Sequence, residues 1–299
     1  MRTRGKGEGA GGGPEVDPPS PTQWRLRDRT LGLDTPVVMG IINLTPDSFS
    51  DGGEFDDPER ALDRAHAMVE EGAGIIDVGG ESTRPGAREI PEEEELRRIL
   101  PFVRAAVSRL PVPVSVDTRK SAVADAALEE GAHVINDVSG LSHDPELGTV
   151  VARWGAGLVL MHMRGTPADM RERARYRDVA GEVRSELEAA LTRALDQGVS
   201  RECLAVDPGI GFAKTPAQSF ELLARLETLH DLGRPLVVGP SRKSFLGALL
   251  ERPPRERVAG TIAASVLAAL RGARILRVHD VREVSDALRV VQAVAEGHE

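Results

Sequence analysis

Two carboxylates, a carboxamide and an ammonium group lie where apolar runs of this chain end. Asp117, Asn136 and Asp207 each end or follow a short apolar run, and Lys243 lies a few residues after another. A carboxylate can accept hydrogen bonds from a ring N–H and an exocyclic amine together, whereas a carboxamide both donates and accepts. If the fold brings these residues together, they suit the polar edge of a heterocycle.

Lysine and asparagine are scarce in this sequence. Of 38 basic residues only four are lysines, and Asn43 and Asn136 are the only asparagines. Since lysine is normally among the commonest residues, arginine has taken the positions that need only a positive charge. We therefore expect Lys120, Lys214 and Lys243 to occupy positions where the wide guanidinium fork does not serve.

From residue 37 onward a unit recurs that consists of an apolar run, a polar loop and an amphipathic stretch. The runs suit parallel strands buried on both faces: residues 37–42, 74–78, 113–116, 133–135, 157–161, 203–206, 235–238 and 274–278. The stretches between them are typical of helices: residues 58–71, 92–109, 120–129, 145–153, 178–197, 216–229, 255–271 and 281–295. Several of these end at a glycine, as helix C-termini do: Gly72, Gly131, Gly155, Gly198 and Gly272.

Eight such units in about 260 residues predict a single-domain (β/α)₈ barrel, a TIM barrel of class α/β. The alternative is an open doubly wound sheet, but no Gly-x-Gly-x-x-Gly follows the first strand. Residues 24–34 are expected to form a short N-terminal hairpin that covers the bottom of the barrel. We assign residues 23–299 to the barrel domain and expect the Gly-, Pro- and charge-rich residues 1–22 to be a disordered tail.

The bulk composition excludes several classes of protein. A net charge of −9 argues against nucleic-acid binding, and no apolar stretch reaches the ~20 residues of a membrane span. The N-terminus has no apolar segment typical of a secretory signal. The single cysteine, Cys203, fits a reducing compartment, so we expect a cytoplasmic location.

Active sites of these barrels lie at the carboxyl ends of the strands. Arg277 and His279 end the eighth run, next to the loop after the seventh, where such barrels often bind phosphate. An arginine fork with an imidazole suits a phosphate or diphosphate.

Structural roles compete with functional ones at some of these positions. One alternative is that Asp117 caps a helix N-terminus and has no other role. Another is that Asn136 caps a helix or forms a turn and has no other role. His162 is expected to be a packed or supporting histidine rather than a catalytic one. The histidines show no spacing typical of zinc ligands.

Five loop sequences, in order and on the expected strand ends, resemble those of the dihydropteroate synthase family. They are Asn-Leu-Thr-Pro-Asp-Ser-Phe-Ser-Asp-Gly-Gly at 43–53, Gly-Gly-Glu-Ser-Thr-Arg-Pro-Gly at 79–86, Asp-Pro-Gly-Ile-Gly-Phe at 207–212, Gly-Pro-Ser-Arg-Lys-Ser-Phe at 239–245 and Arg-Val-His-Asp at 277–280. The resemblance spans residues 36–296. It departs at Ala213, where the family often has glycine, and in the N-terminal tail.

The resemblance implies a transferase of folate synthesis that joins (7,8-dihydropterin-6-yl)methyl diphosphate to 4-aminobenzoate. It implies substrate contacts of three kinds, to pterin, to diphosphate and to aminobenzoate. The pterin would be held by Asp117, Asn136, Asp207 and Lys243, with Met161 and Lys214 also assigned to substrate. Thr83, Arg277 and His279 would hold the diphosphate, and Arg84, Pro85, Phe212 and Ser241 would shape the aminobenzoate site. Asn43 would bind Mg²⁺, the expected cofactor, and the catalytic set would be Asp47, Lys243, Arg277 and His279.

The same resemblance suggests a homodimer whose only other partners are these small molecules. Two other functions remain open at this point. A corrinoid-dependent methyltransferase acting on methyltetrahydrofolate could share the acidic pterin site but would not need the Arg277–His279 pair. A non-catalytic paralogue would be expected to have lost loop residues such as Asp47, Thr83 and Arg84, all of which are present.

Overall fold

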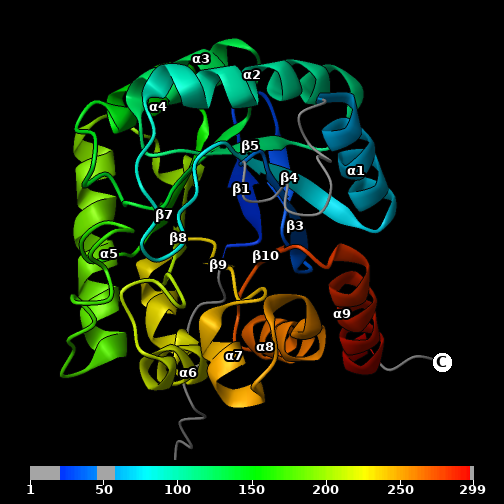
Figure 1. The fold of residues 1–299 in the computed structure, drawn as a ribbon, viewed down its shortest axis with the longest axis vertical. Helices are drawn as coiled ribbons and strands as arrows, with labels where there is room; N and C mark the ends of the chain where they lie inside the picture. The colour runs from blue at the N-terminus through cyan, green and yellow to red at the C-terminus, as the bar shows by residue number, and fades with distance from the viewer. Residues whose placement is uncertain (1–20, 46–57, 297–299) are drawn as a thin grey trace, which may run out of the picture.

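The computed structural model describes residues 21–45 and 58–296 of the chain, and the structural statements that follow concern these residues. Eight parallel strands form one sheet at the centre of the molecule (Figure 1). They are β3 (Val37–Asn43), β4 (Ala73–Gly79), β5 (Val114–Asp117), β6 (Val134–Asp137), β7 (Gly157–Met161), β8 (Leu204–Asp207), β9 (Val237–Val238) and β10 (Ile275–Val278).

The sheet closes into a barrel. Its strand order is β8-β7-β6-β5-β4-β3-β10-β9, and the two outer strands meet at a parallel bridge between Val206 and Leu236. The Val206 N–H also donates to the Pro235 carbonyl at 3.0 Å. Closure of an all-parallel sheet removes both edges, so the predicted (β/α)₈ barrel is confirmed and the open sheet is excluded.

Helices surround the barrel and connect successive strands (Figure 1). They are α1 (Pro58–Glu70), α2 (Glu92–Arg109), α3 (Ser121–Glu129), α4 (Leu147–Trp154), α5 (Val179–Asp196), α6 (Pro216–Ala224), α7 (Ser244–Leu250), α8 (Val258–Leu270) and α9 (Val281–Glu296). The five glycines expected to end helices all have positive φ, between 61° and 106°. Helix α6 begins with a capping box, in which Thr215 and Gln218 satisfy each other's backbone N–H, and with Pro216 in its first turn.

Two elements differ from the sequence expectations. Helix α7 was not expected, because seven residues give too few turns for a periodic pattern to stand out. The stretch 216–229, expected to be one helix, ends as α6 at Ala224 and continues as the 3₁₀ segment Leu226–Leu232.

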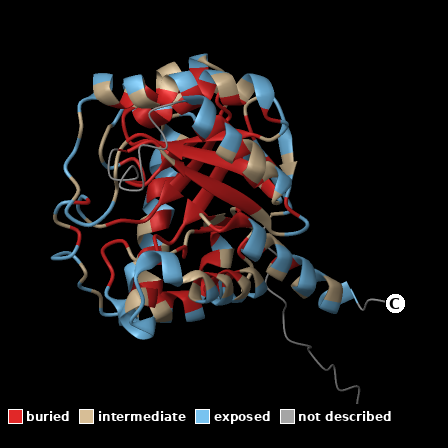
Figure 2. Ribbon diagram, turned by 45° about the vertical axis from the view of Figure 1, so that its right-hand side comes forward, coloured by how far each residue is buried: buried red, intermediate tan, exposed pale blue. Residues whose placement is uncertain are grey.

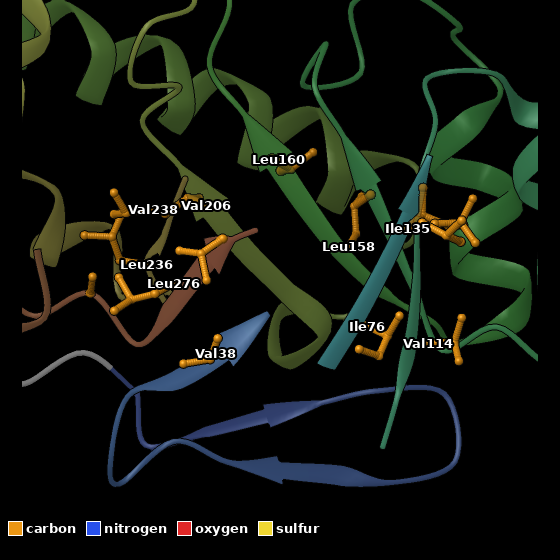
Figure 3. Packing of buried hydrophobic residues seen from close by; sticks show 14 of the residues in the cluster. Val38, Ile76, Val114, Ile135, Leu158, Leu160, Val206, Leu236, Val238 and Leu276 are labelled. Atoms are coloured by element: carbon orange, nitrogen blue, oxygen red, sulfur yellow. The ribbon is translucent and has the colours of Figure 1, made fainter. Parts of the chain in front are cut away.

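Alternate strand residues face outward and pack beneath the helices. Among them are Val38, Ile76, Val114, Ile135, Leu158 and Leu276, which are nearly or fully inaccessible to solvent (Figure 3). The strands are buried on both faces, and the helices expose only their outer sides (Figure 2). This continuous apolar layer explains why the strands appear in the sequence as short, almost uninterrupted apolar runs.

The expected hairpin is present and consists of β1 (Gln23–Arg25) and β2 (Thr30–Gly32), paired antiparallel. Trp24, Leu26 and Leu33 pack against the inward-facing residues at the amino ends of the barrel strands, which include Met39, Ile75, Val159, Ala205 and Ile275. The Trp24 indole N–H donates to the Cys203 carbonyl at 2.8 Å. The hairpin thus closes the bottom of the barrel and leaves the opposite end for the site (Figure 3).

Candidate functional site

The inward-facing side chains change from apolar to polar along the barrel axis. The layer at the hairpin is apolar, whereas most of the next inward positions toward the carboxyl ends are charged or polar. We call this second layer the rim site, formed by Asp77, Asp117, Asn136, Asp207, Lys243 and Arg277. Its position at the carboxyl ends of the strands is that of barrel active sites in general.

Arg277 contacts two carboxylates of the rim site. Its Nε donates to Asp77 at 2.6 Å, and its Nη2 donates to Asp117 at 2.7 Å. Since β10 is separated from β5 by two strands in the sheet, this contact crosses the barrel interior. A guanidinium has five N–H donors, so Arg277 keeps donors for a ligand after both carboxylates are satisfied.

Asp77 is a buried carboxylate that the sequence analysis missed. Besides Arg277, it accepts hydrogen bonds from the Ser115 hydroxyl at 2.6 Å and from the Asn136 amide at 3.3 Å. Asp77 thereby links β4, β5, β6 and β10 and orients both Arg277 and Asn136. The sequence did contain one indication of this role. Asp77 is the only ionisable residue in the apolar run 74–78, and a charge buried there without a partner would be very costly.

The structural alternatives for Asp117 and Asn136 do not hold. Helix α3 has Lys120 as its N-cap residue and no side-chain cap hydrogen bond, so Asp117 does not cap it. The Asn136 carboxamide donates to Asp77 across the barrel interior. The local turn is instead made by Asp137, whose carboxylate accepts from the Ser139 and Leu141 N–H groups.

Charge and burial are closely balanced in the rim site. Burial raises the pKa of Asp117, although the Arg277 charge lowers it, and burial likewise raises the pKa of Asp207. Burial and the Arg277 charge lower the pKa of Lys243, while Asp207 and Asp117 act in the opposite direction. The three groups therefore influence one another electrostatically.

Lys243 and Phe212 lie together at one side of this space. The Lys243 ammonium lies 3.6 Å from the centroid of the Phe212 ring. Phe212 belongs to an apolar cluster with Val138, Met161 and Met170. The neighbouring Ala213 has φ 47°, in the left-handed region that glycine adopts without strain, which gives a conformational reason for the glycine often found there in the resembled family.

His279 and its neighbours form a second group beside the rim site. Ser241 Oγ lies 3.0 Å from His279 Nδ1, and Asn43 Nδ2 lies 3.4 Å from His279 Nε2. Burial and the charges of Arg242, Arg277 and Arg84 lower the pKa of His279 to about 3. The ring is therefore neutral, and the surrounding positive potential favours an anion.

The neutral state of His279 fixes its hydrogen-bond roles. Its Nε2 accepts from the Asn43 amide, so its Nδ1–H donates to Ser241 Oγ. The Asn43 contact to His279 is made by its nitrogen Nδ2, so the carboxamide oxygen of Asn43 takes no part in this hydrogen bond. An oxygen ligand of this kind suits Mg²⁺, but the described residues contain no group of three or more His, Cys, Asp or Glu that could hold a metal.

Thr83, Arg84 and Pro85 lie in the loop after β4. Thr83 is half-buried, and Arg84 and Pro85 are exposed. The Gly86 N–H donates to the Pro167 carbonyl at 2.8 Å, so this loop meets the loop after β7. The Arg84 charge contributes to the lowering of the His279 pKa.

Lys214 lies outside the rim site. Its ammonium donates to the Gly209 and Phe212 carbonyls at 3.1 and 3.0 Å and to His162 Nδ1 at 2.9 Å. These contacts use all its N–H donors, so Lys214 stabilises the loop after β8 rather than presenting a group to a ligand. His162 also lies 3.0 Å from Glu186 and has the expected supporting role.

Asp47 lies outside the described residues, so its expected catalytic role stays a prediction.

Comparison with known proteins agrees with this site. A family model described as "Pterin binding enzyme" matches residues 39–279. The dihydropteroate synthase of Escherichia coli K12 is 47% identical over 90% of this chain and 95% of its own length. A structure of Xanthomonas albilineans dihydropteroate synthase with 4-aminobenzoic acid has a TM-score of 0.86 and 46% identity, and covers 92% of this chain and 98% of that one. Another from the same organism, in complex with 7,8-dihydropteroate, has a TM-score of 0.83 and 43% identity over 91% and 98% of the two chains.

These relatives are named dihydropteroate synthase, and the chain aligns with nearly their whole length. The comparison therefore favours the synthase over the corrinoid-dependent methyltransferase that the sequence left open. The chain belongs to the pterin-binding enzymes and, within them, to the dihydropteroate synthases, which are transferases of folate biosynthesis.

Proposed function

We propose that the rim site and the adjoining His279 group are where (7,8-dihydropterin-6-yl)methyl diphosphate and 4-aminobenzoate are joined. The products would be 7,8-dihydropteroate and diphosphate. The observation that carries this proposal is the meeting of Asp117, Asn136, Asp207 and Lys243 beside a cluster of cations. The related structures that hold 4-aminobenzoic acid and 7,8-dihydropteroate support it.

The pterin is assigned to the acidic part of the site. Asp117 and Asp207 would accept from ring N–H and exocyclic amine groups, and Asn136 would both donate and accept. Asp77 would hold Asn136 in position through their hydrogen bond of 3.3 Å. Lys243 would donate to a ring acceptor, and Met161 would pack against the ring face.

The diphosphate is assigned to the cationic part of the site. Arg277 has donors left after binding Asp77 and Asp117, and His279 lies in the positive potential of Arg242, Arg277 and Arg84. Thr83, on the neighbouring loop, would add a hydroxyl donor. This assignment places the leaving group where its charge is stabilised as the C–O bond breaks.

The Asn43 oxygen, together with diphosphate oxygens and water, is a donor set that fits Mg²⁺. When bound, the ion would help to neutralise the departing diphosphate.

The aminobenzoate is assigned to the outer part of the site, between Arg84, Pro85, Phe212 and Ser241. In the reaction the methylene C–O bond breaks and a C–N bond forms, while the attacking amine loses its proton. Positive charge on the methylene would be spread over the pterin ring, and Asp47 would stabilise it. Because the amine must meet an activated methylene, we expect ordered binding with the diphosphate substrate first, and tight binding of 4-aminobenzoate to the empty enzyme would contradict this.

The decisive assay measures diphosphate release with and without 4-aminobenzoate. Release that depends on 4-aminobenzoate is expected. Methyl transfer to a corrinoid, or pterin binding without turnover, would instead support the methyltransferase or the non-catalytic paralogue.

Arg277→Ala tests the diphosphate assignment. We expect affinity for the diphosphate substrate to fall about 100-fold, as for the loss of charged hydrogen bonds. Affinity for 6-hydroxymethyl-7,8-dihydropterin should fall only about tenfold, because Asp77 and Asp117 lose a partner but the other pterin contacts remain. Isothermal titration calorimetry would measure both.

The control variant for this test is Arg184→Met. It removes an arginine of α5 that is paired with Asp231 at 2.8 Å, outside the proposed site, and should change both affinities little. Equal losses for the two ligands in Arg277→Ala would mean that Arg277 serves the pterin alone.

A homodimer is also proposed, through the face formed by α7, α8 and α9. Within the described part of the chain, the exposed large apolar side chains all lie on these three helices: Leu249, Leu250, Leu267, Leu270, Val290 and Val294. Helices α7, α8 and α9 lie side by side in Figure 1 and contact one another in sequence order. Exposed apolar side chains gathered on neighbouring helices are typical of a protein interface.

A cytoplasmic location stays a prediction, based on the single buried cysteine. None of the helices described in the structure is long and apolar enough to cross a membrane.

A further inference from the structure

Four charged side chains form a buried cluster behind the loop after β4. Glu81, Glu95, Arg119 and Lys120, which we call the Glu81–Lys120 cluster, have side chains that are only 7%, 1%, 6% and 5% exposed. The Lys120 ammonium lies 2.5 Å from Glu81 and 2.7 Å from Glu95, and Arg119 Nη2 lies 2.7 Å from Glu81. Two carboxylates and two cations thus compensate one another, as buried charges require.

The cluster holds both ends of the loop that runs from Glu81 to Ile90. Glu81 lies at its start and accepts the N–H of Ile90 at 3.2 Å. Lys120 donates to the carbonyl of the same residue, Ile90, at 2.7 Å. Arg98 also donates to the Gly80 carbonyl at 2.8 Å. The two ends of the loop are therefore fixed relative to each other by buried, charged hydrogen bonds.

The geometry around Lys120 explains why this position is a lysine in an arginine-rich chain. Its three acceptors are Glu81 Oε2, Glu95 Oε2 and the Ile90 carbonyl. An ammonium has three N–H donors, so each donor meets one acceptor, whereas a guanidinium is a wider planar fork with five donors. Arginine would leave buried donors unsatisfied and would have to displace the loop.

We propose that Glu81 and Lys120 are positioning residues for 4-aminobenzoate: their ion pair fixes the loop that carries Thr83, Arg84 and Pro85. This inference rests on the proposed role of Arg84 and Pro85 in the aminobenzoate site. Neither Glu81 nor Lys120 touches substrate in this assignment. The pterin contacts come from the barrel interior and do not depend on the loop, so the two binding sites should respond differently when the cluster is altered.

Lys120→Arg tests the proposal, because it keeps the charge and changes only the donor geometry. The KM for 4-aminobenzoate should rise about tenfold or more, as expected when a supporting residue lets a binding group shift by about 1 Å. The Kd of 6-hydroxymethyl-7,8-dihydropterin, measured by calorimetry, should stay within about twofold. Glu81→Gln should show the same split between the two ligands.

Arg104→Met is the matched control. It breaks the exposed Arg104–Glu130 ion pair, which also links α2 to the end of α3 but does not contact the loop. Both ligands should bind this variant as they bind the wild type. Unchanged aminobenzoate KM in Lys120→Arg, or equal losses for aminobenzoate and pterin, would overturn the proposal.

A measurement on the wild type covers the case in which the variants do not fold. The Ile90 amide should exchange slowly with deuterium although it lies in a loop, because its N–H is held by Glu81. Exchange at the rate of an unstructured peptide would overturn the proposal. Failure of the underlying function would be separate and visible, since the wild type would then release no diphosphate in response to 4-aminobenzoate.

Discussion

The three lysines within the described chain each lie where a compact ammonium has a specific geometric use. Lys120 donates to two carboxylates and a carbonyl, and Lys214 donates to two carbonyls and an imidazole. Lys243 lies in the rim site over the face of Phe212. The composition therefore indicated positions of special geometry, but only one of the three lysines faces the proposed substrate.

Replacement of Lys243 by arginine should impair catalysis while leaving the fold intact. A guanidinium is a wider planar fork than an ammonium, so its donors would be misplaced beside Phe212. We expect kcat/KM to fall about 100-fold, the loss typical of a misplaced binding group. Thermal unfolding should change little, because the positive charge remains near Asp207 and Asp117. A variant with near-normal turnover would show that a charge at this position is sufficient.

Two elements of the fold support the two ends of the barrel. The N-terminal hairpin covers the bottom of the barrel, and α5 supports the loops after β7 and β8. Glu186 of α5 lies 3.0 Å from His162 and accepts from Arg164 Nε at 3.0 Å. His162 in turn accepts from Lys214, which holds the loop that carries Phe212.

Trp24→Phe should lower stability without lowering activity. The substitution removes the 2.8 Å hydrogen bond to the buried Cys203 carbonyl and part of the apolar contact with the barrel floor. We expect a loss of about 1–3 kcal/mol in the free energy of unfolding, measured by urea denaturation. Turnover well below the melting temperature should be unchanged, because the hairpin and the rim site lie at opposite ends of the barrel. A selective loss of activity in a fully folded variant would contradict this separation.

Glu186→Gln should reduce stability in a pH-dependent way. Although burial alone would raise the pKa of Glu186, hydrogen bonds from His162 and Arg164 lower it to about 2. A lowered folded-state pKa means that the unfolded chain binds more protons between pH 4.5 and pH 2. The stabilising contribution is therefore present above pH 4.5 and is lost as the pH falls toward 2.

The side chain of Glu186 is 41% exposed, so screening by solvent reduces its contribution to about 1 kcal/mol at neutral pH. Urea denaturation of wild type and variant at several pH values would measure the difference. The difference should narrow as the solution is acidified below pH 4.5. A difference that is constant or grows with acidity would show that Glu186 is not the responsible charge.

The proposed dimer contact lies on α7, α8 and α9, where large apolar side chains are exposed. Leu270 is 65% exposed and Val294 is 78% exposed. The other side of the barrel, around α5, carries charged pairs such as Arg184–Asp231 instead. The asymmetry places the proposed dimer contact on one side and leaves the carboxyl ends of the strands open.

Leu270→Glu should convert the proposed dimer to a monomer. A charge within an apolar interface would be buried without a partner, at a cost of several kcal/mol. Sedimentation velocity would measure the change. Ser185→Glu, which places the same charge on α5, is the control and should leave the assembly unchanged. A wild type that sediments as a monomer would contradict the dimer itself.

The sequence alone predicted the eight barrel strands, every helix except α7, and the loops on which the proposed site lies. The apolar character and short length of each run identified the strands, since strands buried on both faces must be apolar throughout. The loop residues showed the family resemblance. The order of strands also placed Asp117, Asn136 and Asp207 at one rim, because carboxyl ends of parallel strands meet there.

Only the tertiary structure decided which atoms meet. Arg277 and Asp77 are 200 residues apart in sequence, and their contact depends on the register of strands around a closed barrel. The same register places Lys243 in the rim site, whereas Lys214 and Lys120 contact loops behind it. An ammonium in the sequence does not reveal its acceptors, since these come from distant segments that become neighbours only when the barrel closes.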